Sequence, residues 1–226
     1  MYIRDQNVSI SLDELLLQSG DSIAEDIKQS SLSRGDYLFH KNDKVNHLTF
    51  VDDGCIKLVH EMCDGQERII RFVTAGEICG LEGLSSYPYS STGIVLRNGN
   101  IKQIPVSIVV KQMTRNQELN WKIYQYINKL SSHTDFWILN FTTGSVIQRL
   151  ARFLLYMFVN QISCQIMSYE QIGNVIGTTT ESVCRSMKVL EGYKAIHKTG
   201  FMRYGINKDL LTEIAYVYEK GIKKYA

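Results

Sequence analysis

The sequence has few of the features that mark disordered, disulfide-linked or membrane proteins. It contains only two prolines and no low-complexity tract, so extended disorder is not expected. No apolar run approaches the ~18 residues of a transmembrane helix, and the N-terminal residues lack the apolar core and small-residue cleavage site of a signal peptide. The five cysteines are odd in number and scattered, which argues against a disulfide framework. We therefore expect a globular cytoplasmic protein that does not enter a membrane.

Motifs that carry chemistry are also missing. The sequence shows no catalytic triad, Gly-rich phosphate loop or metal-ligand spacing, so we do not expect an enzyme. An iron–sulfur sensor needs clustered cysteines near the N-terminus, and the first 54 residues contain none. Cys55, Cys63 and Cys79 could meet His60 in a thiol or haem sensor, but small buried hydrophobic residues are the simpler interpretation. No cofactor is expected.

The charge distribution separates two parts of the chain. The 226 residues, 44% of them hydrophobic, suffice for one large domain or two small ones, and the net charge is only +2. Residues 1–142 hold 14 Lys and Arg against 17 Asp and Glu, a net of −3. Residues 143–226 hold 11 against 6, a net of +5. This asymmetry fits a C-terminal part that binds nucleic acid and a remainder that does not.

From about Leu32 to Ser107, short apolar or alternating runs are separated by glycine and polar turns. Turn signals recur every ~8–12 residues, which is typical of an antiparallel sandwich, roll or barrel. Asp64-Gly65 between two strand-like runs is a strong hairpin signal, and the runs STGIVLR and NIKQIPV are joined around Asn98-Gly99. Before this region, the pattern of residues 9–32 predicts a short helical lead-in.

A long helix is predicted over residues 116–141. Apolar positions alternate spacings of four and three for nearly three heptads, which favours a coiled-coil seam, although a core helix of one chain remains the alternative. The predicted seam comprises Ile123, Ile127, Leu130, Thr134, Trp137 and Phe141. Thr142-Thr143-Gly144 then predicts a hinge and a domain boundary before the apolar helix SVIQRLARFLLYMFV.

The stretch SYEQIGNVIGTTTESVCRSMKVLEG predicts two short helices joined by a tight turn. Ser168 and Gln171 have the spacing of a capping box, and Gly177 can adopt the positive φ of a sharp stop. Thr178 or Thr179 would cap the second helix. The buried stripe of that helix comprises Val183, Met187 and Leu190, and its exposed side comprises Glu181, Ser182, Arg185 and Lys188. The pattern is that of a helix-turn-helix with an exposed recognition helix, although a plain helical hairpin has the same spacing.

The residues after this motif read as a β-hairpin and a final helix. AIHKTGFMRYGI contains two strand-like runs around Gly200, like the wing of a winged helix, and Lys198 and Arg203 suit phosphate contacts. DLLTEIAYVYEKGIKKYA predicts a closing helix with a basic end.

Over residues 30–210 the chain resembles the family of the cyclic-AMP receptor protein and the fumarate–nitrate-reduction regulator, bacterial transcription factors. The glycine landmarks within LSRGDYLFHKNDKVNHLTFVDDGCIKLVHEMCDGQERIIRFVTAGEICGLEGL fall in family order, followed by the long helix and the helix-turn-helix. The resemblance implies an α+β fold: a cyclic-nucleotide-binding-like antiparallel β-roll over residues 1–115 with its lead-in, a dimerisation helix over 116–142, and a winged helix-turn-helix over 143–226.

The resemblance also implies what the C-terminal domain does. In the family, a glutamate and an arginine four residues later read DNA bases, and here they are Glu181 and Arg185. Arg can pair with guanine O6 and N7, and Glu can accept from cytosine N4, although an i,i+4 surface ion pair is the alternative. The expected DNA-binding residues are Thr179, Thr180, Glu181, Ser182, Arg185, Lys188, Lys198 and Arg203. The implied partners are double-stranded DNA, a second copy of the chain and RNA polymerase.

The sensor region departs from the family pattern. The residues that match the family's effector pocket are Gly76, Glu77, Gly80, Glu82, Ser90, Ser91 and Thr92. Family members that bind cyclic AMP place an arginine in this last stretch to neutralise the phosphate, and here it has none; Arg97 lies too far along. Hydroxyls without a cation would hold a phosphate weakly, so we do not expect cyclic-nucleotide binding.

Two functions from different classes therefore remain. The first is a dimeric, sequence-specific DNA-binding transcription regulator with a divergent sensor domain. The second is a small-ligand-binding module that regulates a protein partner without binding DNA. Arg185 and the basic C-terminal domain favour the first.

Overall fold

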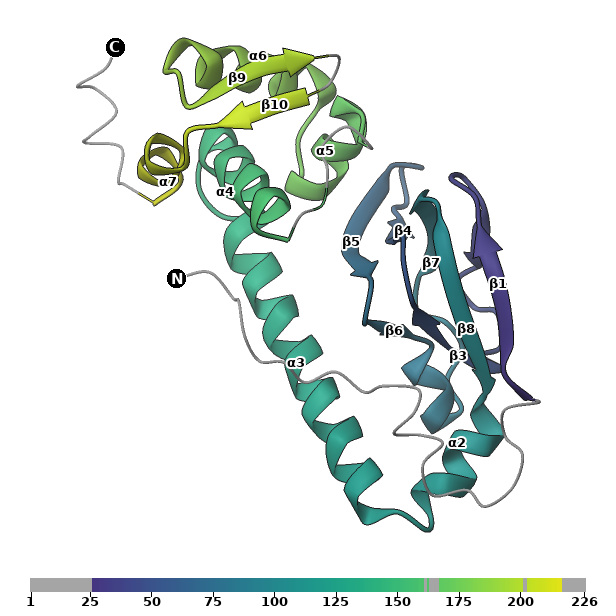
Figure 1. Ribbon diagram of the computed structural model, residues 1–226. Helices are drawn as coiled ribbons and strands as arrows, with labels where there is room; N and C mark the ends of the chain where they lie inside the picture. Colours follow the sequence, from purple (N-terminus) through teal and green to yellow (C-terminus); the bar gives the residue numbers. More distant parts are fainter. Residues whose placement is uncertain (1–25, 161, 163–166, 201–202, 217–226) are drawn as a thin grey trace. The chain divides into compact units, whose positions relative to one another are not determined.

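The computed structural model describes residues 26–160, 162, 167–200 and 203–216 (Figure 1). The chain divides into two compact units, which separate between His133 and Thr134. This division falls inside a continuous helix, α3 (Gln117–Phe141), and not at the boundary predicted around residues 142–144. α3 ends at Phe141, and Gly144 in the connection to the next helix has a φ of 85°.

The first unit is built on two four-stranded antiparallel sheets, as the turn pattern predicted (Figure 1). One sheet has the strand order β1-β8-β3-β6 and the other the order β2-β7-β4-β5. The strands are β1 (Lys28–Leu32), β2 (Tyr37–Phe39), β3 (His47–Val51), β4 (Cys55–Glu61), β5 (Glu67–Thr74), β6 (Ile78–Cys79), β7 (Thr92–Arg97) and β8 (Gly99–Pro105).

Two connections show how the sheets are formed. Asp64-Gly65 lies in the turn between the paired strands β4 and β5, as predicted, with Gly65 at a φ of 78°. The connection around Asn98-Gly99 does not join two paired strands. β7 before it pairs with β2 and β4, whereas β8 after it pairs with β1 and β3. The chain therefore crosses from one sheet to the other at this point.

The predicted helical lead-in is wrong over its last residues. Residues 28–32 form β1, which pairs antiparallel with β8, from Lys28 opposite Gln103 to Leu32 opposite Gly99. Their polar sequence carries no strong strand signal, so the unpaired edge of β8 decides the conformation through its backbone hydrogen bonds. The earlier part of the lead-in, residues 9–25, lies outside the described residues.

Two hydrophobic cores lie within the described residues of the first unit. The core between the sheets takes residues from both, including Val51 and Ile101 from one and Ile56 and Val95 from the other. A second core joins β3, β6 and β8 to α2 (Val106–Met113) and to the first half of α3. At its centre the fully buried Tyr126 accepts a hydrogen bond at 2.8 Å from the backbone N–H of Ile78 in β6. This bond ties α3 to the sheet.

The second unit begins with the last turns of α3 and continues into α4 (Val146–Val159). Trp137 and Phe141 are buried, and both rings pack edge-on against Tyr156 of α4, with centroids 5.9 and 5.5 Å away. Phe141 also packs on Phe153. This aromatic cluster explains why the division of the chain lies inside α3.

Arg152 on α4 forms hydrogen bonds to the C-terminal ends of two other helices, α3 and α7 (Lys208–Tyr216). Its Nη1 lies 3.0 Å from the carbonyl oxygens of Asn140 and Thr143 and 3.2 Å from that of Leu139, at the end of α3. Its Nε donates at 3.0 Å to the carbonyl of Ala215 in α7. Carbonyls at a helix end have no partner within the helix, so one cation stabilises two helix ends.

The rest of the second unit has the order predicted for a winged helix-turn-helix. It contains α5 (Tyr169–Ile176), α6 (Thr180–Gly192), the antiparallel pair β9 (Ile196–Gly200) and β10 (Arg203–Ile206), and α7 (Figure 1). The predicted residues of the closing helix beyond 216 lie outside the described part of the chain. No helix of the described residues carries an apolar stretch sufficient to span a bilayer.

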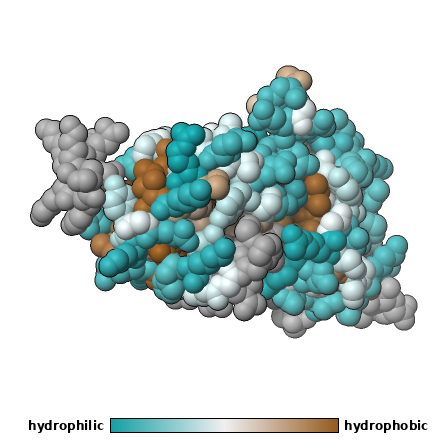
Figure 2. Space-filling view, turned by 90° about the horizontal axis from the view of Figure 1, so that it is seen from above, coloured by the Kyte–Doolittle hydropathy of each residue, from teal (hydrophilic) through white to brown (hydrophobic). Residues whose placement is uncertain are grey.

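The surface is mainly hydrophilic on the face seen in Figure 2, with hydrophobic patches between the polar areas. Several large hydrophobic side chains are exposed, and α3 carries more of them than any other described helix or strand. On α3 they are Trp121, Tyr124, Ile127, Ile138 and Leu139.

Candidate nucleic-acid interface and sensor pocket

Local signals in the sequence set the ends of α5 and α6. The Ser168 hydroxyl accepts from the backbone N–H of Gln171, and the Gln171 side chain accepts from the backbone N–H of Ser168, so the predicted capping box is present. Gly177 ends α5 in the left-handed conformation, with a φ of 67°. Thr179 then caps α6 by accepting from the N–H of Ser182. The turn between the helices is therefore encoded almost residue by residue.

Gly173 allows the turn to close. A β-carbon at this position would lie 2.5 Å from the carbonyl oxygen of Thr178, a backbone atom that cannot move without moving the turn. The turn leading into α6 therefore approaches Gly173 closely. The other helical glycine of the motif, Gly192, has no neighbour within 4 Å of such a carbon.

One face of α6 is buried and the other is exposed. Val183, Met187 and Leu190 are buried, as the predicted stripe requires. The predicted DNA-binding residues lie on the other side: Thr179, Thr180, Glu181, Arg185 and Lys188 are exposed, and Ser182 is partly buried. The first turns of α6 therefore present a polar surface.

Glu181 and Arg185 are available to a ligand. The backbone N–H of Glu181 itself and the Thr179 hydroxyl hold the pKa of the Glu181 carboxyl below its usual value, so the group is an ionised acceptor at neutral pH. Among the described residues, no ion pair joins Glu181 to Arg185. The arrangement thus offers one acceptor and one guanidinium a helical turn apart, without the ion pair that was the alternative interpretation.

The β9–β10 hairpin, the predicted wing, contacts α5. Of its two predicted phosphate-binding residues, Lys198 and Arg203, the structure describes the side chain of Lys198 only. The hydroxyls of Tyr169 in α5 and Tyr204 in β10 lie 2.5 Å apart. Lys198 is exposed on β9. Arg203 begins β10, opposite Gly200, but its side chain lies outside the described residues.

The first unit contains a pocket of about 300 Å³ between its strands and α3. Of the seven residues predicted for an effector pocket, Gly80, Glu82 and Ser91 line it, whereas Gly76, Glu77, Ser90 and Thr92 do not. The full lining is Phe39, Leu58, Arg71, Ile78, Cys79, Gly80, Leu81, Glu82, Tyr89, Ser91, Ile127 and Leu130.

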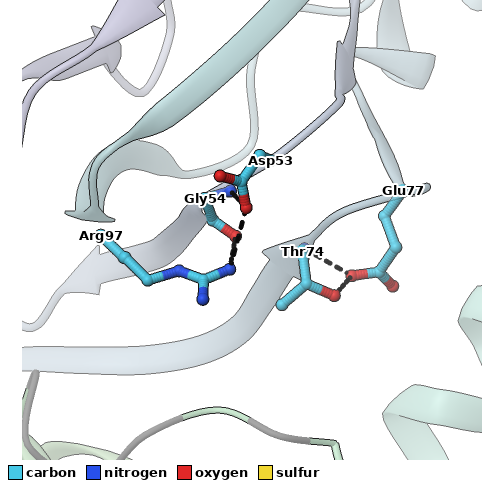
Figure 3. Close-up of polar contacts among 5 residues, drawn as sticks. All are labelled: Asp53, Gly54, Thr74, Glu77 and Arg97. Atoms are coloured by element: carbon cyan, nitrogen blue, oxygen red, sulfur yellow. Dashed lines mark hydrogen bonds and ion pairs between the residues drawn. The ribbon is translucent and has the colours of Figure 1, made fainter.

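Two charged residues near the sheets support turns (Figure 3). The Glu77 carboxylate accepts from the backbone N–H of Thr74 at 2.7 Å and from its hydroxyl at 3.0 Å, and so closes the turn between β5 and β6. The Arg97 guanidinium lies 3.3 Å from the carboxylate of Asp53 and 3.1 Å from the carbonyl of Gly54. Arg97 does not line the pocket, as its distance along the chain suggested.

The pocket contains a cation, Arg71, that the sequence did not predict. No arginine lies in the stretch around residues 89–93, but β5 brings Arg71 to the pocket wall. The expectation of a pocket without a cation is therefore wrong. A signal was present, since Arg71 interrupts the apolar run of β5, yet only the pairing of the strands shows which way that strand faces.

The predicted seam of α3 does not form one exposed stripe. Ile123 is buried in the second core of the first unit, and Trp137 and Phe141 are buried in the aromatic cluster of the second. Ile127 and Thr134 are exposed, and Leu130 is partly buried. Heptad spacing identifies a face of a helix but not what packs on it, and here the face is shared between intramolecular cores and solvent.

The cysteines of the first unit do not share one environment. Cys55 and Cys79 are buried, and burial raises the pKa of each thiol to about 12, so both are neutral at physiological pH. Cys63 is exposed. Within the described residues no group of three or more His, Cys, Asp or Glu side chains is placed to hold a metal ion.

Comparison with known proteins identifies both units. Residues 29–116 match the family of the cyclic nucleotide-binding domain, and residues 148–209 match the Crp-like helix-turn-helix domain. The chain is 23% identical to the transcriptional activator protein anr of Pseudomonas aeruginosa over 180 residues, 76% of this chain and 74% of that protein. It is 23% identical to the fumarate and nitrate reduction regulatory protein of Vibrio cholerae over 223 residues, 95% and 88% of the two chains.

Solved structures share the fold. FixK2 from Bradyrhizobium japonicum superposes with a TM-score of 0.76 at 18% identity, over 85% of this chain and 98% of that chain. A transcriptional regulator of the CRP family from Thermus thermophilus gives a TM-score of 0.72 at 18% identity, over 82% and 96%.

Proposed function

Because this chain belongs to the Crp/Fnr family of DNA-binding transcription regulators, we propose that it acts as a homodimer on a palindromic DNA site. The family and the regulatory function, with no enzymatic activity, are those that the sequence predicted. The homodimer, the form of the site and the residues that read it belong to the proposal.

The exposed start of α6 carries the proposal. Arg185 pairs with O6 and N7 of a guanine, and the ionised Glu181 accepts from N4 of a cytosine, so that each half-site contains a G·C pair. The two side chains are suited to this because neither is engaged by the other and both are exposed. Thr180, Ser182 and Lys188 flank them on the same surface.

Other polar groups contact the phosphate backbone. Lys198 on the wing and the N-terminus of α6, which begins after the Thr179 cap, contact phosphates, which fix register without reading sequence. Arg203 is assigned the same role from its position in β10.

The exposed face of α3 forms the dimer interface. Ile127 and Thr134 of the predicted seam are joined there by Tyr124 and Ile138, at spacings of three and four. Ile123, Trp137 and Phe141 are buried in the chain's own cores and do not enter the interface. Two-fold symmetry then requires half-sites about 34 Å, or one turn of DNA, apart.

The proposal places the protein in the cytoplasm with its DNA, where RNA polymerase is its further partner. Regulation of transcription requires that a bound regulator help or hinder the polymerase. The second function considered from the sequence, a ligand-regulated module without DNA binding, does not account for the exposed Glu181 and Arg185 on α6.

The test compares two substitutions on selected DNA. Sites are selected from random DNA, and affinities for the selected and for mismatched sequences are measured at two salt concentrations. Arg185→Ala should cost about 1–3 kcal/mol per half-site and reduce discrimination at the G·C pair. Lys198→Ala should weaken all sequences alike and make the salt slope shallower by about one unit, because a phosphate contact releases a counterion without reading a base.

Two results would contradict the proposal. If both variants give the same sequence-independent loss, Arg185 does not read a base. For the dimer, Ile127→Asp should convert a dimer into a monomer in ultracentrifugation, whereas Ser132→Asp, exposed on another side of α3, should not. A wild-type monomer at micromolar concentration refutes the interface.

A further inference from the structure

The pocket of the first unit is apolar over most of its wall. Phe39 and Tyr89 stack with ring centroids 3.7 Å apart and form one side. Leu58 and Ile78 come from the strands, and α3 contributes Ile127 and Leu130. A void of about 300 Å³ lies at the small end of the range for ligand pockets. Its shape and lining therefore suit a small molecule with an apolar body.

Arg71 is the single cationic side chain in this wall. One of its Nη atoms donates to the carbonyl of Ile78 at 3.1 Å, but its buried Nε has no hydrogen-bond partner among the described residues. No carboxylate in the described part of the chain forms an ion pair with Arg71. A guanidinium favours the two oxygens of a carboxylate. Arg71 is therefore a cation in the pocket wall that has no carboxylate partner among the described residues.

The two nearby carboxylates are already engaged. Glu77 accepts twice from Thr74, and Oε1 of Glu82 accepts from the Ser90 hydroxyl at 2.9 Å. Glu82 also lines the pocket. Its negative charge disfavours an anionic group beside it, so the anionic end of a ligand belongs at Arg71 and the apolar end elsewhere.

The wall formed by α3 disfavours a nucleotide. Ile127 and Leu130 cannot pair with the donors and acceptors on the edge of a purine, and burying those groups unpaired costs free energy. An aliphatic or aromatic chain has no such groups. The pocket thus separates ligands by their apolar part as well as by their charge.

We propose that this pocket binds a small organic carboxylate with an apolar body, held by Arg71 at its charged end. As an effector assignment, this rests on the proposed function as a DNA-binding regulator. The binding step can be measured without DNA, so the two can fail separately.

The probe is octanoate, titrated by calorimetry into the full-length protein. We expect saturable binding with a dissociation constant below about 1 mM. Acetate, which has the charge without the body, and 1-octanol, which has the body without the charge, should each bind at least about tenfold more weakly. Cyclic AMP should not saturate below about 1 mM. These comparisons use the wild-type protein and do not depend on the folding of a variant.

Three variants locate the charge. Arg71→Gln should weaken octanoate at least about tenfold while leaving 1-octanol unchanged. Glu82→Gln should bind octanoate at least as tightly as wild type, because a negative charge has been removed from the wall. Arg97→Gln, a change at an arginine outside the pocket, should leave the affinity unchanged.

The outcomes separate the two proposals. Failure of octanoate to saturate below about 10 mM, equal binding of octanoate and 1-octanol, or unchanged octanoate affinity in Arg71→Gln would each overturn the carboxylate site. If the site fails while the protein still selects a DNA palindrome, the proposed function stands. If octanoate binds as expected and no DNA sequence is selected, the pocket chemistry stands and the regulator proposal falls.

Discussion

The residues assigned to DNA recognition lie mostly within one short stretch of the second unit, whereas the pocket of the first unit is lined from separate strands, a loop and α3. In the second unit a hydroxyl cap, a positive φ and a glycine place Glu181 and Arg185. In the first unit Arg71 reaches the pocket because β5 pairs with β4, and β4 with β7. The recognition surface therefore depends on residues close together in the chain, whereas the pocket depends on residues that lie far apart in it.

The largest expected effect tests whether the close turn at Gly173 governs the helix-turn-helix of the second unit. Gly173→Ala places a carbon against the Thr178 carbonyl, and such overpacking should destabilise the second unit by about 3 kcal/mol and abolish specific DNA binding. Gly192→Ala, with open space around it, should be neutral or stabilise by up to about 1 kcal/mol. Chemical denaturation and DNA titration measure both. Similar effects at the two glycines would show that the close turn does not govern the motif.

The next effect concerns the tie between helix ends in the second unit. Arg152→Met removes the contacts to the ends of α3 and α7 and should lower the free energy of unfolding by about 2–3 kcal/mol. Arg149→Met on the same helix is the control, because the buried Nε of Arg149 has no hydrogen-bond partner among the described residues and little should be lost. Equal losses in urea melts would refute the role of Arg152.

A smaller effect tests how the first unit is assembled. Tyr126→Phe leaves the buried N–H of Ile78 without its acceptor and should destabilise by about 1–2 kcal/mol. Tyr124→Phe, at a side chain that is 62% exposed, should change stability by less than about 0.5 kcal/mol. Denaturation monitored in the β-roll reports both. If Tyr126→Phe also weakens octanoate binding and leaves DNA-site selection unchanged, the first unit depends on its assembly and the second unit does not depend on the first.

The smallest effect is a pH dependence of the first unit. Burial lowers the pKa of His133. The negative charge of Glu77 acts to raise this pKa, and the positive charges of Arg71 and Lys129 act to lower it further. The unfolded chain therefore takes up a proton at a higher pH than the folded one, so stability is fully present above the ordinary pKa of about 6.5 and falls as the pH drops through it. His133→Gln should reduce this acid-induced loss in melts between pH 7.5 and 5.5, and His40→Gln, at an exposed site, should retain it. An unchanged profile in His133→Gln contradicts the assignment.

The sequence predicted features that depend on neighbouring residues better than features that depend on distant ones. The capping box at Ser168, the stop at Gly177 and the buried stripe of α6 were predictable, because each depends on residues within a few positions of one another. The strand at residues 28–32 was not, because its polar sequence becomes a strand only beside β8. The seam of α3 was predicted as one face, but the structure assigns its members to two cores and to solvent.

For this protein, the sequence alone determined the order of the elements, the antiparallel character of the first unit and the helix-turn-helix with its polar start. Periodicity, turn residues and caps act over short distances, so they can be read along the chain. Only the tertiary structure decided that β7 and β8 enter opposite sheets, that the Thr178 carbonyl closes on Gly173, and that Arg71 lies in the pocket. These depend on which strands pair and which faces pack, and residues far apart in the chain make those choices together.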